Sequence, residues 1–159
     1  MQKPILGFTL LEMMVVLAIM ATILLISLPS FEAKNTRSQV NESIELIKPL
    51  KENMALLYLA EHKFPRTNHE AGIPNAEFLI GNYVQSIALE NGAFHITFGN
   101  KVHAKLQNKI LSVRPMVVKD SPESPISWLC GNDAEPEGMV AIGINKTDVA
   151  NSNLPINCI

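Results

Sequence analysis

The sequence predicts an α+β fold, in which a long N-terminal α-helix, a membrane anchor followed by an amphipathic half, packs on an antiparallel β-sheet. Three observations lead to this prediction. Residues 13–31 carry no charged side chain, and a helix crosses a bilayer with roughly 20 such residues. Apolar residues then recur at three- and four-residue steps to about residue 61. From residue 83 onwards, short alternating segments are separated by turn residues.

The amphipathic half contains no glycine between residues 34 and 59. Its apolar positions follow the helical period: they are Val40, Ile44, Ile47, Leu50, Met54 and Leu57. Pro29 and Pro49 interrupt the pattern. Because a proline lacks the backbone donor and clashes with the preceding turn, each should bend the helix. We therefore expect one bent helix over residues 8–61.

An irregular loop is expected over residues 62–82, because Pro65 disfavours helical geometry at Phe64. The antiparallel sheet is expected over residues 83–118, with strands at 83–89, 93–98, 102–106 and 110–118. Asn91-Gly92 is a strong hairpin pattern between the first two. Shorter extended pieces are expected at 126–129 and 139–144. Alternation within the strands places four polar side chains on the outward face: His95, His103, Lys105 and Arg114.

The start of the anchor reads Gly7-Phe8-Thr9-Leu10-Leu11-Glu12. A carboxylate inside a bilayer is costly and is expected to have a functional partner. Residues 1–7 are polar and carry one cation, Lys3. A secretory leader places its apolar core before the cleavage site, but here the order is reversed. A cut after Gly7 would leave the apolar segment on the mature chain.

This N-terminal pattern resembles the class III leader of type IV pilins and pseudopilins. The resemblance implies that residues 1–7 are a leader, that a prepilin peptidase cuts after Gly7, and that the new N-terminus, Phe8, is methylated. It also implies that helix 8–31 is first a transmembrane anchor and later the filament core. Glu12 would then neutralise the α-amino group of Phe8 in a neighbouring subunit. The family usually has a glycine in the middle of this segment, where the chain has Met20-Ala21.

The C-terminal part, Trp128-Leu129-Cys130-Gly131 with a second cysteine at Cys158, resembles the closing segment of type IVa pilins. The resemblance implies a globular pilin domain over residues 32–159, with a C-terminal disulfide region at 126–159. Both cysteines lie beyond the anchor, in what should be an oxidising compartment, so a Cys130–Cys158 disulfide is expected. Two cysteines without CxxC or HxxxH spacing do not supply a zinc site.

Catalysis has little support in the sequence, and we expect a non-enzymatic protein without cofactor or metal. No nucleophile elbow, phosphate-binding glycine loop or HExxH motif occurs. The four histidines are dispersed along the chain, and we expect them to be solvated polar positions. Asp133, Glu135 and Glu137 could offer oxygen ligands to calcium, but a solvated acidic loop is the preferred interpretation because EF-hand spacing is absent.

Charge is unevenly distributed, although the net charge is only −2 and falls to −3 when Lys3 is removed with residues 1–7. Residues 91–119 contain no acidic side chain and five basic ones: Lys101, Lys105, Lys109, Arg114 and Lys119. Repeated along a filament, such a stripe would bind DNA by counterion release. The preferred alternative is a solvated face that complements the acidic residues after position 119. Aromatic side chains that would stack on bases are absent from that face.

The resemblance implies a structural subunit of a type IV pilus, used for adhesion, motility or DNA uptake. Its expected partners are other pilin subunits, prepilin peptidase, the inner-membrane assembly machinery and the membrane itself. Lys3 on the leader favours a cytoplasmic N-terminus, so the prepilin is expected in the inner membrane and the filament outside the cell. The alternatives are a minor competence pilin that binds DNA and, less favoured because of the C-terminal cysteine pair, a type II secretion pseudopilin.

Overall fold

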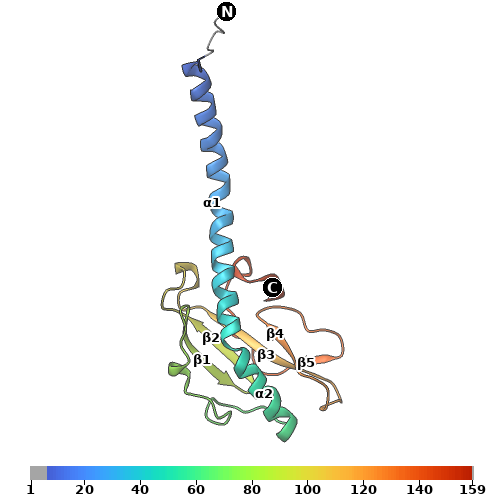
Figure 1. Ribbon diagram of the computed structural model, residues 1–159. Coiled ribbons are helices and arrows are strands. Elements are labelled where there is room, and N and C mark those ends of the chain that lie inside the picture. Colours follow the sequence, from blue (N-terminus) through green and yellow to red (C-terminus); the bar gives the residue numbers. More distant parts are fainter. Residues whose placement is uncertain (1–6, 159) are drawn as a thin grey trace, which may run out of the picture. The chain divides into compact units, whose positions relative to one another are not determined.

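The computed structural model (Figure 1) describes residues 7–158, except for the side chains of residues 27–33. The chain divides into two compact units, Met1–Lys34 and Asn35–Ile159. The first unit holds most of helix α1 (Leu10–Leu46), whose last residues belong to the second. Helix α1 continues through Pro29 without a break. Among the described residues, no helix reaches the length and hydropathy required of a membrane span.

A second helix, α2 (Lys48–Glu61), follows α1 after a one-residue interruption at Ile47. Pro49 stands in its first turn, where no intrahelical donor is needed. The expected single helix over residues 8–61 is therefore wrong in this respect, because the proline starts a new helix rather than only bending the old one. His62 ends α2 in the left-handed conformation, with φ 51°, and its N–H donates to the Tyr58 carbonyl at 2.8 Å.

An irregular segment joins α2 to the sheet, as expected, and includes one 3-10 turn, η1 (Ala76–Phe78). Asn68 organises this segment and is only 8 % exposed. Its Nδ2 donates to the carbonyls of Pro74 at 2.9 Å and Ile87 at 3.1 Å, and its Oδ1 accepts the Leu89 N–H at 2.8 Å. One side chain thus ties the loop to the first strand.

The sheet is antiparallel and has five strands, four of them in the order β1-β2-β3-β4, with β5 also paired to β3. This confirms the predicted fold class. The strands are β1 (Val84–Glu90), β2 (Ala93–Phe98), β3 (Ile110–Val118), β4 (Ser127–Cys130) and β5 (Met139–Ala141). The first hairpin turns at Asn91 and Gly92, with φ 49° and 86°. Two positive φ values are those of a type I′ turn, as the Asn-Gly pair predicts.

The expected strand at residues 102–106 is absent from the described sheet. A 3-10 turn, η2 (Ala104–Leu106), stands there instead. The His103 ring Nδ1 accepts the Lys105 N–H at 3.3 Å, and Leu106 N–H donates to the His103 carbonyl at 2.8 Å. These local bonds compete with strand pairing. Strand β2 is already paired with β3 through Thr97 and Ile110, so no edge is left for an intervening strand.

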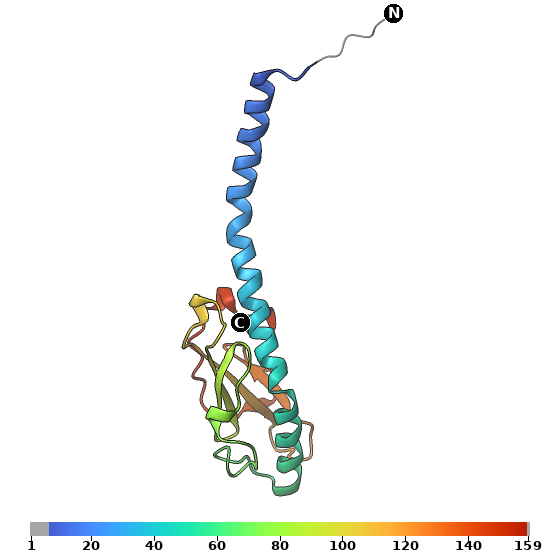
Figure 2. The same cartoon turned by 60° about the vertical axis from the view of Figure 1, so that its left-hand side comes forward.

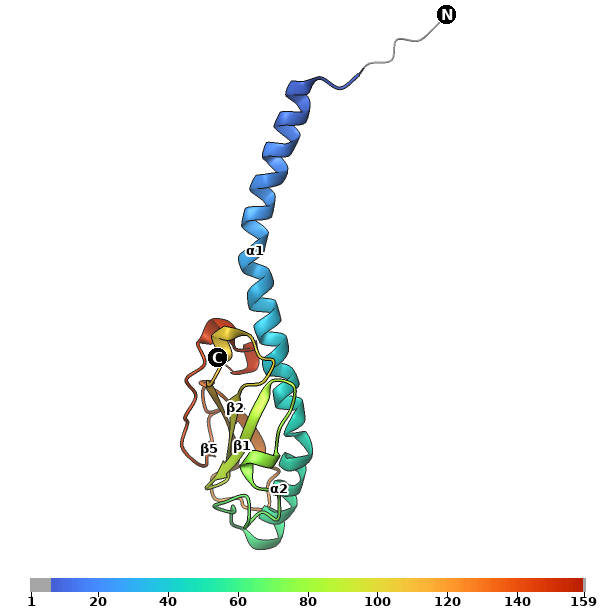
Figure 3. The ribbon, with the colours of Figure 1, turned by 90° about the vertical axis from the view of Figure 1, so that its left-hand side faces the viewer.

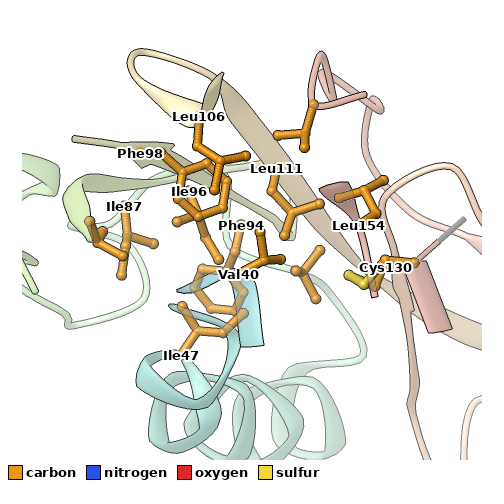
Figure 4. Packing of buried hydrophobic residues seen from close by; sticks show 14 of the residues in the cluster. Val40, Ile47, Ile87, Phe94, Ile96, Phe98, Leu106, Leu111, Cys130 and Leu154 are labelled. Atoms are coloured by element: carbon orange, nitrogen blue, oxygen red, sulfur yellow. A yellow bond between two sulfur atoms is a disulfide. The ribbon is translucent and has the colours of Figure 1, made fainter. Parts of the chain in front are cut away.

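The core lies between one face of the sheet and the helices of the second unit, as Figures 2 and 3 show from two sides. Val40, Ile47 and Met54 contribute the helical side and are at most 1 % exposed. This confirms the predicted apolar face of the amphipathic half. The sheet side is formed by alternate strand residues, visible in Figure 4: Ile87, Phe94, Ile96, Phe98 and Leu111.

The outer face of β2 and β3 is covered by the chain that follows β5. We call residues 142–148 the crossing segment. Ile142 N–H donates to the Pro115 carbonyl at 2.8 Å, Lys146 N–H to Ser112 Oγ at 2.8 Å, and Asp148 N–H to the Ile110 carbonyl at 3.1 Å. His95 lies on this face and is only 4 % exposed. The expectation that His95 is solvated is therefore wrong, because the sequence pattern does not show what returns across the sheet.

Candidate functional site

The first turn of α1 is closed by two residues that hydrogen-bond reciprocally. Thr9 precedes the helix, and its Oγ1 accepts the Glu12 N–H at 3.3 Å. The Glu12 carboxylate in turn accepts the Thr9 N–H at 3.0 Å and the Thr9 hydroxyl at 2.9 Å. This is a capping box, which satisfies backbone donors that a helix N-terminus otherwise leaves without partners. The Thr-x-x-Glu spacing was the sequence pattern that could have predicted it.

The capping box fixes the position of the Glu12 carboxylate at the start of the apolar helix. Both bonds from Thr9 are accepted by the same oxygen, Oε2. A carboxylate has about four acceptor sites on its two oxygens. Oε1 can therefore accept a further donor without loss of the contacts with Thr9. A cation approaching the helix start would meet an acceptor that is already oriented.

The Gly7-Phe8 bond lies just before the capped turn. Residues 7–9 are exposed and belong to no helix or strand. Among the described residues, no atom beyond the chain neighbours of Gly7 lies within 4 Å of a Cβ placed on it. Phe8 is 76 % exposed. The Gly7-Phe8 bond is thus uncovered and lies four residues before Glu12.

The side chains of α1 between Leu10 and Ile26 are exposed on every side of the helix. Most are large and apolar, among them Leu10 at 78 %, Leu17 at 60 % and Ile26 at 78 % exposure. A helix that is apolar all round belongs in a membrane or in the interior of a larger assembly, and exposed apolar surface of this extent marks an interaction site. This segment therefore requires a covering partner.

At the other end of the chain, Cys130 on β4 is bonded to Cys158 in the last 3-10 turn, η4 (Ile156–Cys158), with their Cα atoms 4.5 Å apart. The bond closes a segment that also contacts helix α1. There Arg37 Nε donates to the Ser152 carbonyl at 3.3 Å, and Thr36 Oγ1 to Asn153 Oδ1 at 3.4 Å. The segment that ends at Cys158 is thereby held on both the sheet and the helix.

The five basic residues proposed for DNA binding do not share one strand face. Lys101 and Lys105 lie in the connection between β2 and β3, and Lys119 lies after β3. Lys109 Nζ lies 3.3 Å from Asp148 Oδ2, and Arg114 NH1 lies 4.0 Å from Glu135 Oε1. The Arg114 side chain is only 13 % exposed. Two of the five cations thus face acidic groups of the C-terminal part.

Titratable side chains do not gather into a metal site: within the part of the chain that the structure describes, no three of His, Cys, Asp and Glu lie where they could share an ion. Asp133 Oδ1 instead accepts the Ala134 N–H at 2.9 Å.

Together, a capped apolar N-terminal helix, an amphipathic continuation packed on an antiparallel sheet and a C-terminal disulfide define the class of α+β proteins to which this chain belongs. Residues 36–159 match the pilin family, described as bacterial filament proteins, and residues 3–28 match the prokaryotic N-terminal methylation motif. The chain belongs to the pilin family and is a type IV pilin.

Three curated relatives illustrate the similarity. The type IV major pilin protein PilE1 of Neisseria gonorrhoeae is 31 % identical over 96 % of this chain and 86 % of its own length. A fimbrial protein of Neisseria meningitidis serogroup A is 30 % identical over 79 % of this chain and 72 % of its own. The fimbrial protein EcpC of Eikenella corrodens is 31 % identical over 81 % of this chain and 84 % of its own length. These relatives support a structural subunit of a pilus.

Proposed function

We propose that this pilin is processed after Gly7 and assembles with other pilin subunits through helix 8–31. The observation that carries the proposal is the apolar surface of α1 between Leu10 and Ile26, which is exposed all round. Before assembly the bilayer would cover it, and in the filament the corresponding helices of other subunits would do so. The prokaryotic methylation motif at residues 3–28 supports the same course.

Glu12 is proposed to select the register between subunits. Cleavage after Gly7 creates an α-amino group on Phe8, a cation at the start of an apolar helix. A charge without a partner is expensive in an apolar interior, and removal of one partner from a buried pair is strongly destabilising. The capping box holds the Glu12 carboxylate in place, and its Oε1 can accept the amino group of a neighbouring Phe8. Thr9 contributes to this position through its backbone N–H as well as its hydroxyl, and the N–H remains when the side chain is changed.

The proposed location follows from the same segment. The precursor would be anchored in the inner membrane with residues 1–7 in the cytoplasm, where prepilin peptidase and the assembly machinery act. The globular domain and the finished filament would lie outside the cell. The oxidising exterior suits the Cys130–Cys158 disulfide.

The experiment separates the charge of Glu12 from its capping role. Glu12→Gln keeps an acceptor for the Thr9 N–H but removes the charge, whereas Thr9→Ala removes the hydroxyl and keeps the charge. Glu45→Gln, an exposed position later in α1, is the matched control. Filaments sheared from cells that express each variant are quantified against the pool of processed subunit in the membrane.

We expect Glu12→Gln to be processed but to yield few filaments, and Thr9→Ala to retain most of the wild-type yield. The control should assemble normally. Normal assembly of Glu12→Gln would refute the charge pairing. Equal losses in Glu12→Gln and Thr9→Ala would show that helix capping, not charge, is what assembly requires.

A further inference from the structure

The crossing segment is attached to the sheet around one buried histidine. His95 on β2 is paired with Ser112 on β3, and its Nδ1 lies 2.9 Å from Ser112 Oγ. The same hydroxyl oxygen accepts the Lys146 N–H at 2.8 Å. The histidine, the serine and the crossing segment therefore form one hydrogen-bonded chain across the outer face of the sheet.

The packing above His95 shields its ring from solvent. The side chain is 4 % exposed and Ser112 is 0 % exposed. The crossing segment approaches β2 so closely that a Cβ on Gly143 would lie 2.6 Å from the Ala93 Cβ. His95 Nε2 is buried and has no hydrogen-bond partner among the described residues. In a protonated ring, both nitrogens are donors, so Nε2–H would point into a site without an acceptor.

The charged groups around His95 largely compensate each other. Glu90 at the end of β1 and Lys146 on the crossing segment form an ion pair at 2.5 Å. Arg114 lies on the same face of β3 and faces Glu135, and Lys109 faces Asp148 at the end of the crossing segment. Burial lowers the pKa of His95, Glu90 raises it and Lys146 lowers it further, with a net lowering.

We propose that protonation of His95 releases the crossing segment from the sheet, so that residues 142–148 act as an acid-sensitive latch on the C-terminal region. Opening lets water reach Nε2 and breaks the Lys146 N–H bond to Ser112. The core face of the sheet, on the other side of β2 and β3, keeps its contacts with the helices. Opening of the latch is therefore a local change in the outer surface of the sheet and not a global unfolding.

The direction of the pH dependence follows from linkage. In the open form the ring is in water and has its ordinary pKa of about 6.5, whereas in the closed form burial lowers the pKa. The open form thus binds the proton more tightly. The closed latch is most stable above about pH 6.5, and its stability falls as the pH drops from there towards the pKa of the closed form.

Amide hydrogen exchange of the full-length chain in detergent micelles tests the latch. The amides of Lys146 and Asp148 report on the crossing segment, and amides of the β2–β3 ladder serve as the internal reference. Between about pH 7.5 and pH 5, protection of the two reporters, corrected for intrinsic exchange, should fall up to about tenfold per pH unit once the pH is below about 6.5. Protection of the ladder should stay constant.

His95→Gln should abolish this slope, while His69→Gln in the exposed loop should retain it. Ser112→Ala should lower protection at every pH without removing the slope, and it keeps the test valid if His95→Gln does not fold. A ring titration by NMR should place the pKa of His95 below the ordinary histidine value of about 6.5. A flat profile in the wild type, an unchanged slope in folded His95→Gln, or a His95 pKa at or above about 6.5 would each overturn the proposal.

Discussion

Lys109 and Asp148 link the basic residues 91–119 to the acidic part of the chain that follows them. The Lys109 ammonium lies 3.3 Å from the Asp148 carboxylate. The other oxygen of that carboxylate, Oδ1, accepts the Ile110 N–H at 2.6 Å. One acidic side chain therefore neutralises a lysine and also completes the backbone hydrogen bonding of β3. The relationship supports charge complementation within the domain as the role of at least this basic residue.

Neutralisation of the basic residues should accordingly leave DNA retention unchanged. We expect filaments of the Lys101→Gln, Lys105→Gln and Lys109→Gln triple variant to retain as little duplex DNA at low salt as wild-type filaments do. The variant should lose only about 0.2–1 kcal/mol of stability, the usual contribution of an exposed ion pair such as Lys109–Asp148. Filament pull-down at several salt concentrations measures retention. Clear wild-type retention that weakens in the variant, with a flatter salt dependence, would instead support DNA binding.

Processing should produce a mature chain that begins with N-methylated Phe8. The reason is the exposed Gly7-Phe8 bond before an intact apolar helix. Intact-mass measurement of protein from sheared filaments gives the result directly. Retention of residues 1–7 in assembled subunits would contradict this prediction, and a cut at a later bond would contradict the assignment of Phe8.

Loss of the disulfide should destabilise the globular domain by about 3–4 kcal/mol, because the bond closes a loop of roughly 29 residues in the unfolded chain. Cys130→Ala combined with Cys158→Ala is the suitable variant, since it leaves no lone thiol. Thermal unfolding of the full chain in detergent is compared with that of the wild type before and after reduction. Reduced wild type and the double variant should behave alike. Free thiols in the native wild type would contradict the bond.

Phe94→Ala should cost about 3–5 kcal/mol, the usual range for a large aromatic side chain removed from a core. Phe94 is 0 % exposed and packs against Trp128, with the ring centroids 5.8 Å apart. Phe78→Ala is the matched control, because Phe78 is 70 % exposed and surface changes usually stay within about 0.5 kcal/mol. Similar unfolding temperatures of the two variants would show that the core is not organised around Phe94.

Asn68→Ala should destabilise by about 1–3 kcal/mol, because it leaves the buried Leu89 N–H without its acceptor. Asn75→Ala is the control, since Asn75 is exposed and makes no side-chain cap to η1. Denaturation of both variants is compared with that of the wild type. Hydrogen exchange should also show faster exchange at Leu89 in Asn68→Ala alone, and unchanged exchange there would contradict the assigned bond.

Local patterns predicted those parts of the fold whose structure depends on near neighbours. The bounds of β2 and β3 and the Asn91-Gly92 turn agree with the sequence prediction, because alternation and turn chemistry act over a few residues. The burial of His95 and the 3-10 turn η2 at Ala104–Leu106 could not be predicted in this way. Both depend on segments distant in the chain: the crossing segment covers His95, and β3 occupies the edge of β2.

At the candidate site, the roles of Gly7, Phe8 and Glu12 were predicted from the sequence and remain predictions. The capping role of Thr9 was missed, although its spacing from Glu12 was visible. The Cys130–Cys158 pairing agrees with the structure. The expected common face of the basic residues does not agree with the structure. The prediction placed a strand at residues 102–106, where the chain forms η2.

Strand β1 ends the sheet, and Asn68 gives that end an additional property. The carboxamide occupies the Ile87 carbonyl and the Leu89 N–H, two of the groups with which an edge strand recruits another strand. A side chain here imitates a neighbouring backbone and leaves that stretch of β1 closed to strand addition. Subunits crowded along a pilus would then be prevented from joining sheet to sheet at this stretch, a route that leads to amyloid-like aggregation instead of an ordered helical polymer.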